Sequence, residues 1–122
     1  MKHAVLDTNF VLSCIRKKID FFEKIPLMGM KIIIPIQVID EIRKISRMGK
    51  GKFKDDAKLA LTLMEKNRFN RIDLHTRNVD NGLISLAKKN KNYIIGTLDT
   101  EIKNRTQSSV LVIRGEKRLE VI

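Results

Sequence analysis

The sequence predicts a three-layer α/β domain, in which helices cover both faces of a parallel sheet of about five strands. The chain has 122 residues, a length that suits one domain, and its 43% hydrophobic content is sufficient for a buried core. Short β-branched runs alternate regularly with stretches of helical spacing. This alternation is typical of a parallel sheet with helices on both faces. We therefore expect residues 1–122 to form a single domain with the doubly wound strand order 3-2-1-4-5.

Five apolar runs predict the strands, because each is short and rich in β-branched residues. They are HAVLD (3–7), KIIIP (31–35), RIDLH (71–75), NYIIGT (92–97) and SVLVIRG (109–115). A sixth run, RLEVI (118–122), follows a turn at Gly115 and can add a short strand at the edge of the sheet.

Two helices are expected near residues 36–47 and 53–66, with a basic segment between them. This segment, RMGKGKFKDD, combines two glycines with four basic residues and predicts a flexible loop. Such a loop is either a solvated connector or a surface that contacts phosphate groups, and the sequence leaves both interpretations open.

The chain is strongly basic, with 25 Lys and Arg residues against 14 Asp and Glu residues and a formal net charge of +11. This excess favours a polyanionic partner, and nucleic acid comes before an acidic membrane surface. The alternative is a solvated surface with surplus lysine, because charge alone identifies no substrate.

Several other classes of protein are disfavoured. The single cysteine, Cys14, lies in an apolar context, so it indicates a small buried hydrophobe and neither a disulfide framework nor a zinc site. No apolar run approaches the roughly 18 residues of a membrane-spanning helix. The N-terminal MKHAVLD reaches a charge too soon for a signal peptide. We expect a cytoplasmic protein with no membrane partner.

Two acids follow the ends of predicted strands. Asp7 ends the first strand, and Asp99 follows the fourth. In parallel sheets of this kind, ligands bind beyond the carboxyl ends of the strands, near the point where the strand order reverses. The alternative for both residues is capping of the next helix, which Asp does well without any chemistry.

Two further acids lie on predicted helices. On a helical wheel of residues 37–48, Glu41 falls at the edge of the apolar face, whereas Asp40 falls almost opposite that face. On residues 78–90, Asp80 falls inside the apolar arc. The alternative interpretation of Asp80 is an acid in the first turn that interacts with the helix dipole. This explains the position of Asp80 along the helix but not the direction in which it points.

The four carboxylates of Asp7, Glu41, Asp80 and Asp99 can therefore converge at one edge of the sheet. Two carboxylates about 5 Å apart repel by roughly 3 kcal/mol at an effective dielectric of 20, so such a cluster must protonate or hold a cation. Oxygen ligands without Cys or a suitably placed His select Mg²⁺ or Mn²⁺ over zinc. Such ions activate water and stabilise phosphoryl displacement, so a basic chain with this acidic centre suits a nuclease.

The chain resembles the PIN domain family through four motifs in order: LDTN (6–9), VIDEI (38–42), VDNGLISLAKK (79–89) and IIGTLDTEIKNR (94–105). The resemblance implies a Rossmann-like nuclease fold and divalent-metal-dependent endoribonuclease activity. The family's catalytic and metal-binding acids correspond to Asp7, Glu41, Asp80 and Asp99. Its small polar residues correspond to Asn9, which in the family orients the first aspartate, and Thr97, which lies near the metal-bound water. Asp40 and Glu101 are left outside this set.

Basic side chains of residues 43–54 are the candidates for RNA contacts: Arg43, Lys44, Arg47, Lys50, Lys52 and Lys54. The five phenylalanines are expected in the core and not as platforms for base stacking. Because aromatic residues make up only 5% of the chain, backbone electrostatics should dominate RNA binding. For Thr8 we prefer a role in the turn or the helix cap.

The resemblance leaves two cellular roles. The first, which we favour, is a processing nuclease that matures ribosomal or other structured RNA. The second is a toxin ribonuclease that a small antitoxin silences. A third hypothesis, of another class, is a catalytically silent RNA-binding module. Members of the family are often dimers, so a homodimer is also expected.

Overall fold

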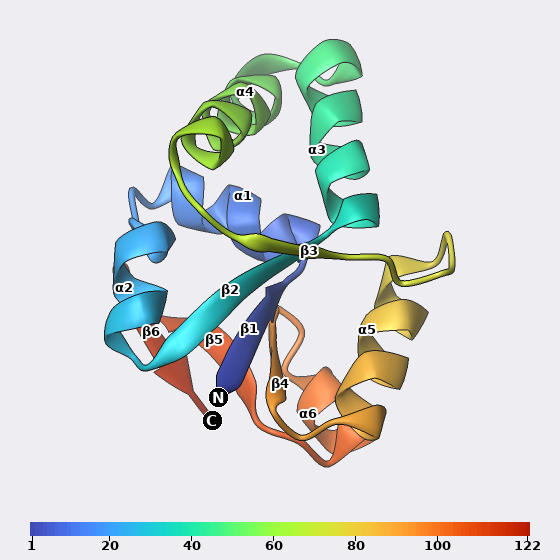
Figure 1. The fold of residues 1–122 in the computed structure, drawn as a ribbon. Coiled ribbons are helices and arrows are strands. Elements are labelled where there is room, and N and C mark those ends of the chain that lie inside the picture. The colour runs from blue at the N-terminus through green and yellow to red at the C-terminus, as the bar shows by residue number, and fades with distance from the viewer.

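Residues 1–122 of the computed structural model form one six-stranded sheet with helices on both of its faces (Figure 1). The strand order is β3-β2-β1-β4-β5-β6. The first five strands pair in parallel, whereas β6 runs antiparallel to β5. The predicted class, the order 3-2-1-4-5 and the additional edge strand are therefore confirmed. The strands are β1 (Lys2–Leu6), β2 (Met30–Pro35), β3 (Asn70–Ile72), β4 (Tyr93–Gly96), β5 (Val110–Arg114) and β6 (Arg118–Val121).

Six helices connect the strands: α1 (Thr8–Arg16), α2 (Phe21–Leu27), α3 (Ile36–Met48), α4 (Gly51–Lys66), α5 (Val79–Lys89) and α6 (Glu101–Thr106). Helices α1 to α4 contribute their apolar side chains to a cluster on one face of the sheet. Helices α5 and α6 contribute theirs to two smaller clusters on the other face. No helix is long and apolar enough to cross a membrane.

The central strands are buried on both faces, which explains their continuous apolar runs. In β1, Ala4 and Leu6 belong to the larger core cluster, whereas the intervening Val5 packs with α5 on the opposite face. Successive side chains of a strand point to opposite faces, so this division follows directly from the pleat. Cys14 is fully buried, and its burial raises the pKa of the thiol to about 12, as expected for a small packing residue.

The third predicted strand is too long. Residues 71–75 were expected to be extended, but β3 covers only Asn70–Ile72. His75 adopts a left-handed backbone conformation with φ of 56°, so an extended strand cannot continue through it. Asp73 and Leu74 instead make hydrogen bonds with a side chain of α3.

The predicted flexible basic loop is also wrong. Helix α4 begins at Gly51, so only Gly49 and Lys50 separate it from α3. The two helices pack closely against each other through their apolar faces, and Ile42 and Ala57 are both fully buried. Figure 1 shows this pair of helices beyond the carboxyl ends of β1 and β2. Most of the basic residues of the segment therefore sit on helical backbone.

Candidate active site

The four predicted acids come from four separate elements at one edge of the sheet. Asp7 lies between β1 and α1, and Asp99 lies in the loop after β4. Glu41 is on α3, which follows β2 directly, and Asp80 is on the first turn of α5. Because the strands are parallel, their carboxyl ends meet at the same edge, and the elements that follow them bring these acids together.

Asp7 is the centre of this acidic cluster. Its pKa is raised from 3.8 to about 6, chiefly by burial of the carboxyl, and the negative charges of Asp80, Glu41 and Asp99 raise it further. The backbone N–H of Thr8 acts in the opposite direction. Asp7 precedes α1 but makes no side-chain capping hydrogen bond, so capping does not account for it. Its own backbone N–H donates to the carbonyl oxygen of Gly96 at 3.0 Å, which ties the end of β1 to the end of β4.

Glu41 and Thr8 meet beside Asp7. Partial burial raises the pKa of the Glu41 carboxyl, and the charge of Asp80 raises it further, whereas the Thr8 side chain lowers it. The Thr8 Oγ1 atom is buried beside the Glu41 carboxyl, but it makes no hydrogen bond of good distance and angle. Our preference for a cap role of Thr8 was therefore wrong, because no side-chain cap is formed at α1. A buried hydroxyl without a partner among carboxylates is a polar atom that a bound ligand or water can satisfy.

Asp99 has a structural role in addition to its place in the cluster. Its Oδ1 accepts a hydrogen bond from the backbone N–H of Glu101 at 3.0 Å, and its backbone N–H donates to Thr97 Oγ1 at 3.0 Å. One oxygen of Asp99 is thus used in a turn just before α6, whereas the N-cap residue of this helix is Thr100, which makes no side-chain cap. Thr97 is fully buried and shapes the loop that presents Asp99.

Asp80 does not lie where the helical wheel placed it. The wheel put it inside the apolar arc of α5, but the residue is exposed. The fully buried residues of α5 begin only at Gly82 and Leu83, and the first turn leaves Asp80 open to solvent. Capping is carried out by Asn78, whose side chain accepts from the backbone N–H of Asn81 at 3.0 Å. Asp80 therefore interacts with the cluster through its charge and is not a cap.

Asn9, the predicted orienting residue, is exposed on the first turn of α1. No hydrogen bond joins it to Asp7; it lines a small hollow beside the acids. The larger hollow of the molecule, about 870 Å³, lies elsewhere, with Met30 and Lys31 at the start of β2 and Phe69 and Asn70 at the start of β3 among its lining residues. It is therefore near the opposite ends of the strands from the acids.

The cluster suits a divalent cation by its chemistry. Carboxylate oxygens without thiol or imidazole partners are ligands for Mg²⁺ or Mn²⁺. Burial is the main cause of the raised pKa of Asp7, and the charges of Asp80, Glu41 and Asp99 raise it further, so a nearby cation would lower the cost of ionising this carboxyl. No three of the acids lie close enough in this structure to hold one ion together, so their side chains would have to rotate to share an ion. The residues present therefore fit such an ion by the chemistry of their oxygen atoms.

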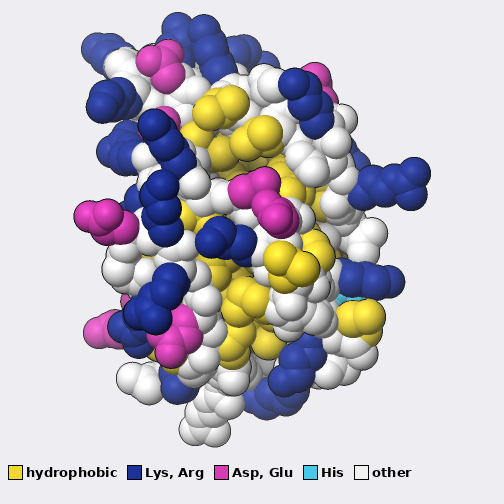
Figure 2. All heavy atoms as spheres, turned by 90° about the vertical axis from the view of Figure 1, so that its left-hand side faces the viewer, with side chains coloured by type: hydrophobic (Ala, Val, Ile, Leu, Met, Phe, Trp, Pro, Cys, Tyr) yellow, Lys and Arg dark blue, Asp and Glu magenta, His cyan; other side chains and the backbone are white.

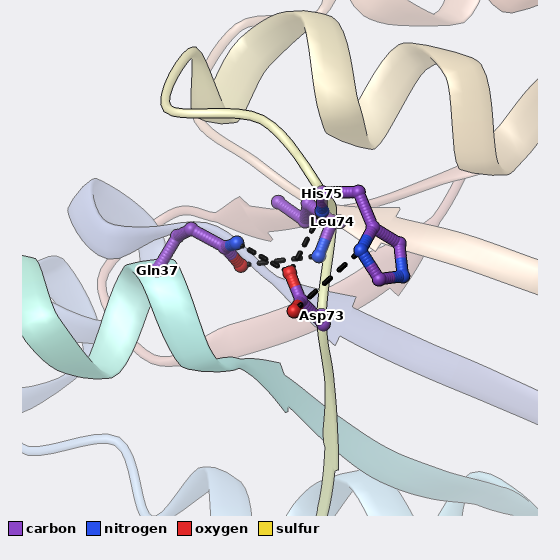
Figure 3. A network of polar contacts seen from close by, with 4 residues as sticks. All are labelled: Gln37, Asp73, Leu74 and His75. Atoms are coloured by element: carbon purple, nitrogen blue, oxygen red, sulfur yellow. Dashed lines mark hydrogen bonds and ion pairs between the residues drawn. The ribbon is translucent and has the colours of Figure 1, made fainter.

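A hydrogen-bonded clamp, which could not be predicted from the sequence, joins α3 to the loop that leads into α5 (Figure 3). Gln37 Nε2 donates to Asp73 Oδ1 at 2.7 Å, and Gln37 Oε1 accepts from the backbone N–H of Leu74 at 3.1 Å. The backbone N–H of His75 also donates to Asp73 Oδ1, at 2.8 Å. Gln37 is one turn before Glu41 on α3, and the loop it holds leads into α5. The only sequence signal was an Asp and a His inside a predicted strand.

We expect Gln37→Ala to raise the pKa of the Asp73 carboxyl. The hydrogen bond from Gln37 is the first cause of a pKa below the ordinary 3.8, followed by the backbone N–H of His75 and the His75 charge. This contribution stabilises the fold above the ordinary pKa and is lost as the pH falls below it. NMR titration of the carboxyl groups measures the shift. Gln37→Glu is the matched control and should raise the pKa further, because it adds a second carboxylate. An unchanged pKa in Gln37→Ala would contradict the clamp.

The candidate RNA-binding residues gather near the tip of the α3–α4 pair. Arg43, Lys44 and Arg47 are exposed on α3, and Arg43 lies 3.5 Å from Asp40 in an ion pair. Lys50 and Lys52 are exposed, and Lys54 is half-buried. Figure 2 shows basic side chains crowding the upper end of the molecule, where Figure 1 places the turn between these helices. The basic residues therefore lie beyond the same edge of the sheet as the acids.

Comparisons with known proteins are consistent with this geometry. Residues 4–118 match a family described as a PIN like domain. Ribonuclease VapC4 of Methanocaldococcus jannaschii is 26% identical over 127 residues, which cover 99% of this chain and 97% of that protein. The rRNA-processing protein fcf1 of Schizosaccharomyces pombe is 26% identical over 105 residues, which cover 84% of this chain but only 52% of that protein. The solved structure of the PIN domain endonuclease Utp24 has a TM-score of 0.74 and 26% identity, with 98% of this chain and 90% of that chain covered.

Proposed function

The chain belongs to the PIN-like domain family, and on this basis we propose that it is a divalent-metal-dependent endoribonuclease. The observation that carries the proposal is the convergence of Glu41, Asp80 and Asp99 on the half-buried Asp7. A basic pair of helices stands beside them. The likeness to a ribonuclease, an rRNA-processing protein and a PIN domain endonuclease supports a nuclease, and the metal requirement is our inference from the acids.

The four acids would hold Mg²⁺ or Mn²⁺ through their carboxylate oxygens. When bound, such an ion activates a water for attack on phosphorus and stabilises the charge of the displacement. Asp7 anchors the site from the central strand, and Thr97 fixes the loop that presents Asp99. The basic residues of α3 and the start of α4 would bind the phosphates on either side of the scissile bond.

Two cellular roles remain within this activity. The first is processing of ribosomal or other structured RNA, which the name of fcf1 supports, although this chain spans about half the length of that protein. The second is a toxin ribonuclease with an antitoxin partner. The observation that favours the second role is the correspondence with ribonuclease VapC4 over nearly the whole length of both chains. A small gene for an antitoxin next to the gene for this chain would decide for the second role.

We expect the protein to cleave single-stranded or looped RNA in Mn²⁺ or Mg²⁺ and to stop in EDTA, because the carboxylates alone supply no activated water. The measurement is gel analysis of end-labelled RNA, followed by sequencing of the RNA ends. Asp55→Asn serves as a control, because Asp55 is an exposed acid outside the cluster and should leave cleavage unchanged. Equal cleavage with EDTA and with Mn²⁺ would rule out the metal mechanism. RNA binding without cleavage in any divalent ion would instead favour the silent RNA-binding module.

A further inference from the structure

A small hollow opens beside the acidic cluster, between α1, α4 and the loop after β4. Its volume is about 120 Å³, and its lining includes Asn9, Leu12, Arg16, Phe53, Asp56 and Leu98. Two of these residues lie next to site acids in the sequence: Asn9 follows Asp7 by two residues, and Leu98 directly precedes Asp99. A group bound in the hollow would therefore be close to the bond that the acids act upon.

The hollow exposes apolar surface that the fold does not use. Phe53 is 42% exposed and Leu98 is 50% exposed, whereas Leu12 is buried. The expectation that every phenylalanine lies in the core was therefore wrong for Phe53. It sits on the first turn of α4, which extends beyond the sheet, so no strand covers its ring. An exposed aromatic ring beside a catalytic cluster offers a flat surface for stacking.

Charged and polar groups surround this apolar surface. Arg16 Nε donates to Asp56 Oδ2 at 3.1 Å, and this ion pair fixes both side chains across α1 and α4. The terminal guanidinium nitrogens of Arg16 make no hydrogen bond within the chain, so they remain available as donors. The Asn9 amide can both donate and accept. Lys52 and Lys54 flank Phe53 in the sequence and supply positive charge for a phosphate backbone.

An aromatic ring, hydrogen-bonding groups and flanking cations are the combination with which proteins bind the unstacked bases of single-stranded RNA. The volume of about 120 Å³ is well below the roughly 300–1,000 Å³ of ordinary small-molecule sites. A hollow of this size suits one base and not a whole nucleotide. The edge of a base offers acceptors for the donors of Arg16 and Asn9, and its flat face matches the exposed Phe53 ring.

We propose that this hollow binds the unpaired base next to the scissile phosphate, with the Phe53 ring as the stacking surface, so that it selects where the RNA is cut. This inference rests on the proposed ribonuclease function. It adds Phe53, Arg16 and Asn9 as specificity-determining residues, in contact with substrate but outside the acidic cluster.

The test is an abasic scan of a short single-stranded RNA that the protein cleaves at one position. Each nucleotide in turn is replaced by an abasic one, and affinity is measured in EDTA so that binding is read without cleavage. For wild-type protein, loss of one base beside the scissile bond should weaken binding roughly 5- to 100-fold, the range for one stacked base. Phe53→Ala should weaken binding of the intact RNA by a similar factor. It should have no further effect on the RNA that lacks that base.

Two variants make the comparison specific. Phe53→Tyr keeps an aromatic ring and should retain the affinity. Leu59→Ala removes another large apolar side chain that is 49% exposed on α4 but does not line the hollow, and it should change nothing. Thermal melts of all three variants establish that they are folded.

The outcomes separate this inference from the function on which it rests. If wild-type protein cleaves RNA but no abasic position matters, the inference is wrong and the ribonuclease proposal stands. If Phe53→Ala leaves affinity unchanged, or weakens binding equally for every abasic RNA, Phe53 is not a base platform. That result would also be expected if a protein segment occupies the hollow. If no cleavage is found in any divalent ion, the ribonuclease proposal fails. The hollow can still be tested, because the abasic scan measures affinity and can be made on any RNA that the protein binds.

Discussion

Asp80→Asn is expected to reduce RNA cleavage by about 100-fold or more while leaving RNA affinity in EDTA nearly unchanged. The substitution keeps the shape of the side chain but removes one negative charge from the cluster around Asp7, so a divalent cation would bind more weakly. The charge of Asp80 is one of the causes of the raised pKa of both Asp7 and Glu41. Without cation, its removal relieves repulsion, and the variant should melt at a higher temperature than wild type in EDTA.

The alternative for Asp80 gives the opposite result. If Asp80 interacts only with the dipole of α5, neutralising it should lower the stability of the fold by about 0.3–1 kcal/mol and leave RNA cleavage unchanged. Thermal melts in EDTA and in Mn²⁺, beside a cleavage assay, distinguish these readings. Asp55→Asn is a matched control, because Asp55 is also an exposed acid in the first half of its helix but lies outside the cluster. A variant that melts lower in EDTA and still cleaves RNA would remove Asp80 from the proposed site.

The metal-free protein should lose stability as the pH rises from about 4 to 7, and Asp7 should be a principal cause. The pKa of Asp7 is raised from 3.8 to about 6, so the folded chain holds this proton more tightly than the unfolded chain. Stability is therefore greatest below the unfolded value and falls between pH 3.8 and 6, by up to about 3 kcal/mol from this group. Glu41, whose pKa is also raised, acts in the same direction. The lowered pKa of Asp73 acts below 3.8 and leaves this interval unaffected.

Denaturant unfolding in the absence of divalent ions, at several pH values from 4 to 7, measures this effect in wild type and in Asp7→Asn. The comparison with the variant is needed because a chain of net charge +11 has other pH-dependent contributions. In the variant, the free energy of unfolding should change much less between pH 4 and 7, and the variant should be the more stable protein at pH 7. Saturating Mn²⁺ should stabilise wild type at pH 7 and much less near pH 5, because protons compete for Asp7. If the free energy of unfolding depends on pH in the same way in the two proteins, the pKa of the Asp7 carboxyl is not raised in the folded chain.

The strands and their order could be predicted because they depend on patterns that short stretches of sequence contain. The isoleucines of a run such as KIIIP favour a strand that is buried on both faces, and its alternation with helical stretches favours a parallel sheet. The positions of the acids followed from the same rule, since residues after parallel strands must meet at one edge. The three acids whose charges raise the pKa of Asp7 could therefore be identified from local sequence information.

Tertiary structure decided the features that depend on what lies next to a segment from elsewhere in the chain. The helical wheel placed Asp80 inside an apolar arc, and Phe53 was expected in the core, but both residues lie on the first turns of their helices and are exposed. The extent of a sheet cannot be read from the periodicity of one helix. The predicted third strand ended early because Gln37, from a distant helix, binds the backbone and side chain of the next residues.

The sequence by itself therefore determined the class of fold, the order of the central strands and which acids lie at their carboxyl edge. Only the tertiary structure decided which of those acids is buried enough to change its pKa, what joins α3 to the loop that leads into α5 and where an aromatic ring stays exposed. The physical reason is that burial, and with it the cost of a charge or the exposure of a ring, is set by contacts between residues far apart in the chain. Periodicity records only which side of an element is apolar, and the packing of the other elements determines how far that side is covered.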